Sequence, residues 1–205
     1  MADDPIAHVL RRGEAAAQGV DAFPIEPGYV IHWGMWNGAA VPGKPVIDQV
    51  DPRNPDIIEP VDQRIFWATA LPTPPDALAL RSDTVRFNRV LGVIGGGSGG
   101  PLFPASVTRF GATVNFATGD ISQGVLDIDR TDVWHVEFAG KIRGSFADLK
   151  VLPPSTVNQS NPVKGAIGGV FTGSKGDVLL GGFQFEDAGN PDRHVEGLIQ
   201  VAPPP

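Results

Sequence analysis

The sequence contains no cysteine among its 205 residues, so it can form neither a disulfide framework nor a thiolate metal site. It also lacks any basic run, and its formal net charge is −7. Nucleic-acid binding requires a cationic face that replaces counterions, so we expect no nucleic-acid partner. No stretch approaches the roughly 18 apolar residues of a membrane helix, so we expect no transmembrane segment.

The first residues are acidic and lack the apolar region of a signal peptide, so residues 1–5 do not predict one. Instead, residues 4–18 favour one short helix. Asp3 or Asp4 would cap it, Pro5 suits its first turn, and Gly19 would end it. We therefore expect residues 1–27 to form an N-terminal arm or short helix, separate from the rest of the chain.

Glycine and proline are abundant, with 26 and 20 residues, which predicts many turns. Between these turns apolar residues alternate with polar ones. In residues 133–143, for example, Trp134, Val136 and Phe138 share one face while His135 and Glu137 share the other. This period of two is typical of a half-buried strand. The expected strands are residues 28–37, 63–71, 84–94, 105–109, 111–118, 121–128, 133–143, 165–172, 177–186 and 194–201.

Short turns separate most of these strands, which predicts hairpins and antiparallel neighbours. Glycines inside the strands, such as Gly168, Gly182 and Gly197, favour strong curvature of the sheet. The predicted fold class is therefore all-β: an antiparallel eight-to-nine-stranded β-barrel over residues 28–205. A helical turn is expected at residues 76–80. Long loops are expected at residues 38–62 and 151–164, both rich in proline, and residues 95–100 should form a glycine-rich loop.

Four motifs in the C-terminal half follow one another in a characteristic order. They are VNFATG (114–119), WHVEFAG (134–140), GVFTG (169–173) and GGF (181–183). In this order they resemble the β-barrel domain of transferrin-binding-protein-like bacterial surface proteins, over about residues 111–201. The WGMW stretch, residues 33–36, is also similar to the barrel at the C-terminus of some FecR-domain envelope proteins.

The resemblance implies an extracytoplasmic place in a bacterial cell envelope, in the periplasm or at the cell surface. The sequence departs from the transferrin-binding lobe because it has no lipobox cysteine and no room for the accessory handle domain. Transferrin binding is therefore not carried over. What the resemblance implies is a protein partner in the envelope or outside the cell.

Two residue patterns partly match known chemical motifs. Residues 96–100 match the G-x-S-x-G nucleophile elbow, but the prolines that follow cannot start the long helix which that motif requires. Asp127, Asp129 and Asp132 surround a turn as calcium ligands do, yet the EF-hand pattern is incomplete. We predict no catalytic residue, no metal site and no resident cofactor.

One set of neighbouring residues is a candidate site for a small ligand. His32 stands beside Trp33 and Trp36, and these three would bind a haem or a small hydrophobic molecule if the barrel were hollow. Because aromatic side chains usually fill cores, the tryptophans could instead be packed inside the barrel.

Two functions remain open at this point. The first is a non-enzymatic binding or structural module of a bacterial envelope protein that contacts a macromolecular partner through its loops. Ile57, Ile58 and Val61 are its candidate contacts. The alternative is a carrier of a small hydrophobic ligand or haem in the barrel mouth. An inward set of large aromatic residues favours a filled barrel and hence the first function: Phe87, Phe116, Trp134, Phe138, Phe171, Phe183 and Phe185.

Overall fold

A computed structural model describes residues 9–12, 18–37, 47–50, 58–61 and 64–205. The chain divides into two compact units. One comprises residues 23–31 and 69–205, and the other comprises residues 1–22 and 32–68. The predicted boundary between an arm of residues 1–27 and a barrel of residues 28–205 stays a prediction.

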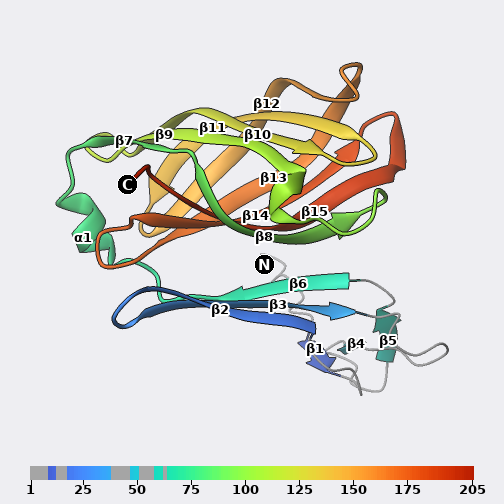
Figure 1. Ribbon diagram of the computed structural model, residues 1–205, viewed down its shortest axis with the longest axis horizontal. Helices are drawn as coiled ribbons and strands as arrows, with labels where there is room; N and C mark the ends of the chain where they lie inside the picture. The colour runs from blue at the N-terminus through green and yellow to red at the C-terminus, as the bar shows by residue number, and fades with distance from the viewer. Residues whose placement is uncertain (1–8, 13–17, 38–46, 51–57, 62–63) are drawn as a thin grey trace, which may run out of the picture. The chain divides into compact units, whose positions relative to one another are not determined.

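The larger unit contains a nine-stranded antiparallel sheet with the order β7-β9-β10-β11-β12-β13-β14-β15-β8 (Figure 1). Most of its strands follow one another as hairpins, as the turn residues predicted. The all-β antiparallel barrel is therefore confirmed. The strands are β7 (Thr84–Phe87), β8 (Arg89–Gly97), β9 (Val107–Asn115), β10 (Asp120–Asp129), β11 (Val133–Arg143), β12 (Phe146–Val157), β13 (Asn161–Thr172), β14 (Val178–Asp187) and β15 (Asn190–Ala202).

The barrel closes where the chain changes partners at Asn88. β7 pairs with residues 112–115 of β9, whereas β8 pairs with β15 at the other end of the sheet order (Figure 1). The N–H of Asn88 donates to the carbonyl of Ala202 at 3.2 Å. Residues 89–94 of β8 and 107–111 of β9 thus border a seam, in which neither segment has a second strand partner among the described residues.

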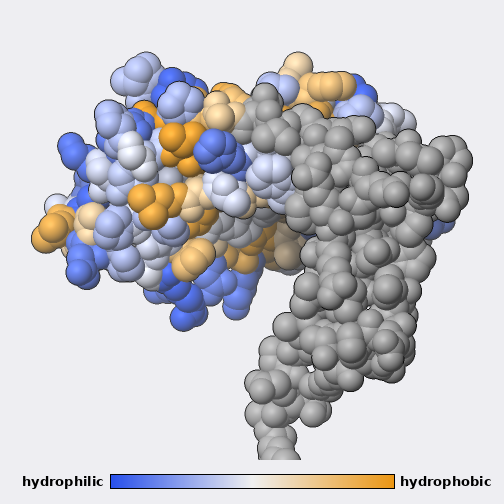
Figure 2. Space-filling view, turned by 90° about the horizontal axis from the view of Figure 1, so that it is seen from below, coloured by the Kyte–Doolittle hydropathy of each residue, from blue (hydrophilic) through white to orange (hydrophobic). Residues whose placement is uncertain are grey.

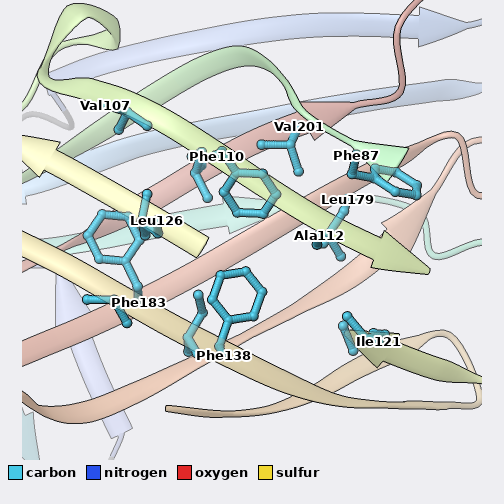
Figure 3. Packing of buried hydrophobic residues seen from close by; sticks show 14 of the residues in the cluster. Phe87, Val107, Phe110, Ala112, Ile121, Leu126, Phe138, Leu179, Phe183 and Val201 are labelled. Atoms are coloured by element: carbon cyan, nitrogen blue, oxygen red, sulfur yellow. The ribbon is translucent and has the colours of Figure 1, made fainter. Parts of the chain in front are cut away.

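The inner face of the barrel is filled by large side chains. Trp134, Val136 and Phe138 are all at most 3% exposed, as their alternation predicted. In Figure 3, side chains from β9, β10, β11 and β14 point toward one another in the interior. The Phe110 and Phe138 rings lie 5.8 Å apart between centroids. The predicted inward aromatic set is buried throughout: Phe87, Phe116, Trp134, Phe138, Phe171, Phe183 and Phe185.

The segment before β7 caps one end of the barrel. Its helix α1 (Pro75–Ala79) corresponds to the predicted helical turn and buries Leu78. Thr73 fixes this cap, because its hydroxyl donates to the carbonyl of Gly173 at 2.6 Å. The Ser145 hydroxyl in turn donates to the carbonyl of Thr73 at 2.5 Å.

Two three-stranded sheets precede the barrel in sequence. One has the order β1-β4-β5, with β1 (Val9–Arg12), β4 (Ile47–Val50) and β5 (Ile58–Val61). The other has the order β2-β3-β6, with β2 (Gln18–Glu26), β3 (Tyr29–Asn37) and β6 (Arg64–Thr69).

These sheets correct three expectations. Within the helix expected at residues 4–18, the described residues 9–12 form a strand. The strands expected at residues 28–37 and 63–71 exist but belong to the β2-β3-β6 sheet and not to the barrel. The loop expected at residues 38–62 contains β4 and β5. A strand depends on neighbours distant in sequence, which local propensity does not reveal.

The second long loop, expected at residues 151–164, is also wrong. β12 runs to Val157 and β13 begins at Asn161, so only residues 158–160 form a turn. Likewise β8 continues to Gly97, and it shortens the glycine-rich loop expected at residues 95–100. No helix among the described residues is long and apolar enough to cross a membrane.

Candidate functional site

Four connections meet at the end of the barrel opposite the α1 cap, and we call them the rim. They are residues 98–106, 130–132, 158–160 and 188–189. The Thr131 hydroxyl contacts the carbonyl of Gly99 at 3.5 Å. The Asn158 side-chain amide donates to Asp132 at 2.8 Å. Hydrogen bonds between turns therefore hold the rim together.

A charged network reinforces the rim from within. Arg193 lies between two carboxylates: its Nε is 3.1 Å from Asp132 Oδ1, and a terminal nitrogen is 2.7 Å from Asp187 Oδ2. Asn161 donates to the same Asp187 oxygen at 2.7 Å. The sequence analysis missed Arg193 and Asp187 as partners because they face each other only after the β14–β15 hairpin forms.

The carboxylate of Asp187 is fully buried. The hydrogen bond from Asn161, followed by those from the Gly189 N–H and Arg193, lowers the pKa of Asp187, although burial opposes this shift. Hydrogen bonds to the charged form favour ionisation. The network therefore stabilises the rim in its deprotonated state.

The barrel mouth enclosed by the rim is almost closed. Its cavity has a volume of about 10 Å³ and is lined by Trp134, Ile128, Leu102 and the glycines of residues 96–100. About one water molecule fits in such a space. Sites for small molecules typically measure roughly 300–1,000 Å³. This cavity is therefore too small for haem or another carried ligand.

The G-x-S-x-G match has a structural role in the rim. The Ser98 hydroxyl donates to the carbonyl of His194 at 3.2 Å and accepts from the N–H of His194 at 3.1 Å. Only a three-residue 3-10 helix, Pro104–Ser106, follows it. The strand–turn–helix geometry that exposes a nucleophile is not formed here.

Two of the three aspartates around the turn at residues 127–132 pair with basic side chains or histidine. Asp127 accepts from Arg109 at 2.6 Å and lies 2.7 Å from His135 Nδ1. Asp132 is bound by Arg193, as described above. Within the described part of the chain, no group of three His, Asp or Glu side chains is placed to hold a metal ion.

His32, Trp33 and Trp36 all lie in β3. Consecutive residues of a strand point to opposite faces, and accordingly His32 is exposed whereas Trp33 is 2% exposed. The structure therefore does not direct these two side chains into one site. The side chain of Trp36 lies outside the described residues. The ligand role of the three residues stays a prediction.

An exposed apolar surface on the rim was not predicted. Phe103 is 53% exposed and Val133 is 42% exposed. The Arg130 guanidinium lies over the Phe103 ring, 5.4 Å from its centroid. The only signal in the sequence was a phenylalanine between two prolines. Of the candidate contacts named earlier, Ile57 and the side chains of Ile58 and Val61 lie outside the described residues.

No protein-family model and no curated protein matches the sequence. Solved structures do. The chain is similar to transferrin-binding protein B. A mutant of that vaccine antigen from Haemophilus parasuis shares 13% identity over 92% of this chain and 37% of its own, with a TM-score of 0.44. The isotype 1 protein from serogroup B Neisseria meningitidis shares 13% over 93% of this chain and 35% of its own, with a TM-score of 0.45.

The chain therefore spans 37% and 35% of the lengths of these two structures. Function has to be argued from the residues of the chain itself.

Proposed function

We propose that this domain is a non-enzymatic binding module of a bacterial envelope protein, and that it contacts a macromolecular partner through its rim. The observation that carries the proposal is the filled interior. Side chains such as Trp134 and Phe138 occupy the barrel, and the mouth leaves about 10 Å³. A partner would therefore bind to the outer surface of the barrel.

The rim suits a protein contact for chemical reasons. Aromatic residues and arginine dominate the binding energy of protein interfaces. Phe103 and Arg130 supply this pair on a support braced by Arg193 and its two carboxylates. Among the residues that Figure 2 colours, hydrophobic ones are interspersed with hydrophilic ones.

The motif resemblance supports the part of the proposal that concerns location, namely a bacterial envelope domain in the periplasm or on the cell surface. The names of the similar structures state transferrin binding for those proteins. The proposal for this chain concerns a protein partner of the envelope or the cell exterior, with no fixed identity.

Photo-crosslinking in the bacterium of origin tests the rim. A photoreactive phenylalanine analogue at position 103 should yield one discrete cross-linked protein. The same analogue at position 152, on the outer wall of β12, should yield none. Leu152 is a suitable control because it is 37% exposed and pairs with Glu137 of β11, outside the rim.

A double variant, Phe103→Asp with Arg130→Glu, should remove the cross-linked complex when the analogue is placed at position 133. Its thermal unfolding should match the parent, because both side chains are on the surface. A complex that survives this double variant, or equal cross-linking from positions 103 and 152, would refute a rim contact.

A further inference from the structure

A groove lies on the outer wall of the barrel, at the starts of β8 and β14 and the end of β15, and we call it the outer groove. Its volume is about 600 Å³, and all of its lining residues belong to the larger compact unit. Sites for small molecules measure roughly 300–1,000 Å³. The outer groove therefore has the room for a ligand that the barrel mouth lacks.

A β-bulge in β8 turns Leu91 toward the outer groove. In the ladder with β15, Gly92 pairs with Gln200. The next pair is Val90 with Val201, so Leu91 is an extra residue between the two pairs. Val90 packs against the core, whereas Leu91 is 38% exposed and lines the groove. Bulges re-aim side chains and are frequent next to active sites, so this bulge is a feature of the groove and not a defect of the strand.

The floor of the outer groove consists of side chains on the outer face of the barrel. Leu179 and Val201 belong to the core. Their neighbours Val178 and Gln200 therefore project outward, because successive residues of a strand point to opposite faces. Both line the groove, together with residues 23–26 of β2. The walls are thus mainly apolar.

One cation stands at the margin of this apolar space. Arg89 is exposed, and in the described part of the chain it is the only basic residue that lines the groove. Its Nε donates to the carbonyl of Pro203 at 3.3 Å, and no ion pair joins it to a carboxylate of the described residues. A guanidinium binds a carboxylate by two parallel hydrogen bonds. Arg89 therefore offers a place for an anionic group, in a chain whose net charge is −7.

The two carboxylates that line the groove have partners of their own. Asp177 lies 3.1 Å from Arg81. Hydrogen bonds from Ser174, and to a smaller extent the charge of Lys175, lower the pKa of Glu26. The charges of both acidic residues are therefore compensated within the protein, whereas the charge of Arg89 is not.

The side chain of Gln200 is a second polar group without a partner. It is 1% exposed, and its Nε2 has no hydrogen-bond acceptor among the described residues. Leaving a buried donor unpaired costs free energy. Arg89 pairs with Ala202, two residues along β15 from Gln200, so Arg89 and Gln200 are diagonal neighbours. Long side chains reach each other at this spacing. An oxygen atom bound by Arg89 would thus also be an acceptor for the Gln200 amide.

We propose that the outer groove binds an amphipathic carboxylic acid, of the class of medium-chain fatty acids. The carboxylate would lie beside Arg89 and Gln200, and the apolar chain would lie along Leu91 and Val178. A single cation at the margin of an apolar groove matches a ligand with one charged end and an apolar body. Because Arg89 and Leu91 are exposed, the ligand would exchange freely with solvent and would be lost during purification.

This inference goes beyond the proposed contact with a macromolecular partner, and it uses a surface other than the rim. The two can therefore fail separately. The rim double variant, Phe103→Asp with Arg130→Glu, should bind a fatty-acid probe as well as the parent does.

The probe is dansylaminoundecanoic acid, used below its micelle concentration with the full chain. Its dansyl emission should rise and shift to the blue, and should saturate at one probe per chain. Dodecanoate should displace it. Dodecanol has the same chain length without the charge, and it should displace the probe about tenfold less well or worse, a difference equivalent to about 1.4 kcal/mol.

Two pairs of variants test the contacts. Arg89→Gln should abolish the preference for dodecanoate over dodecanol, whereas Arg143→Gln, at an exposed arginine outside the groove, should keep it. Leu91→Ser should weaken binding of both compounds severalfold, whereas Leu152→Ser, of nearly equal exposure, should not change it.

Urea unfolding should give similar midpoints for these four variants, because the replaced side chains are on the surface. Absence of saturable binding to the parent, equal displacement by dodecanol, an unchanged preference in Arg89→Gln, or unchanged binding in Leu91→Ser would each overturn the proposal.

Discussion

At the residue scale, single contacts decide which side chains the barrel can hold. A Cβ on Gly124 would lie 2.3 Å from Cδ2 of the Phe138 ring and 2.3 Å from the Phe138 carbonyl. The neighbouring residue Gln123 adopts a φ of 51° at the same irregularity of β10. Gly124 is therefore required by a close approach of ring and backbone.

We expect Gly124→Ala to lower the free energy of unfolding by about 1–3 kcal/mol, because the added methyl group overpacks the core. Gly182 in β14 is the matched control. A Cβ there would lie 3.5 Å from Leu198, an ordinary contact. Gly182→Ala should change the free energy of unfolding by about 1 kcal/mol or less, in either direction. Urea unfolding of both variants checks this, and equal losses would contradict it.

The pH response is also a residue-scale property. Because hydrogen bonds lower the pKa of Asp187 in the folded chain, its stabilising effect is complete above the ordinary aspartate pKa of about 3.9. The effect is lost as pH falls through the lowered folded value. Asp187→Asn should therefore flatten the decline of stability below about pH 4.

The measurement is the midpoint of urea unfolding at pH values from about 2.5 to about 6, a range that brackets the ordinary aspartate pKa. Asp148→Asn is the control, because Asp148 is exposed and its ion pair is with Arg143, which is also exposed. The parent and Asp148→Asn should show similar acid slopes. If the unfolding midpoint of Asp187→Asn falls with pH as steeply as that of the parent, protonation of Asp187 does not cause the loss of stability.

At the element scale, the α1 cap depends on one arginine. Arg81 follows the helix and forms a two-pronged contact with Asp83 at 2.9 and 2.6 Å. It also donates to the carbonyl of Lys175 at 2.7 Å and lies 3.7 Å from the Phe116 ring centroid. The planar guanidinium thus joins the cap to the β13–β14 turn and to the barrel core.

Replacing Arg81 should loosen this end of the barrel. We expect Arg81→Ala to cost about 1.5–3 kcal/mol, the range for hydrogen bonds to charged groups. Arg81→Lys should recover little, because an ammonium group lacks the fork geometry. Urea unfolding gives the magnitude, and amide exchange at residues 173–177 should accelerate in both variants. Full recovery by lysine would show that charge alone suffices.

At the scale of the whole molecule, the closed sheet leaves its outer surface for binding. Inward rings from segments remote in sequence pack against one another, as the Phe87–Phe171 and Phe116–Phe171 pairs do at 5.9 and 5.7 Å between centroids. A filled barrel of about eight or nine strands has no room for a carried ligand.

We therefore expect native and denaturing mass spectrometry to give the same mass for protein purified gently from its source. The filled interior and the small mouth are the reason. A small-molecule mass lost on denaturation would contradict this. It would instead support a carrier function, with His32, Trp33 and Trp36 as the candidate ligand contacts.

Much of the barrel could be predicted because its signals are local. The alternation around Trp134 predicted the buried face of β11, and turn residues predicted the hairpins. Pro153 and Pro154 were the reason for the incorrect prediction of a loop at residues 151–164. They lie at a register shift of β12, where the ladder needs fewer backbone donors. The N–H of Glu137 opposite them is satisfied by the Ser155 hydroxyl at 2.9 Å.

The sequence by itself determined the fold class, the inward aromatic set and the absence of thiol chemistry, because side-chain periodicity and composition need no knowledge of distant partners. Only the tertiary structure decided which strands close the barrel, and that Asn88 is where the chain changes partners. It also brought Arg193 to Asp187 and placed Phe103 under Arg130. Each of these depends on pairing between segments remote in sequence, and the free energy of such pairing is set by packing and register.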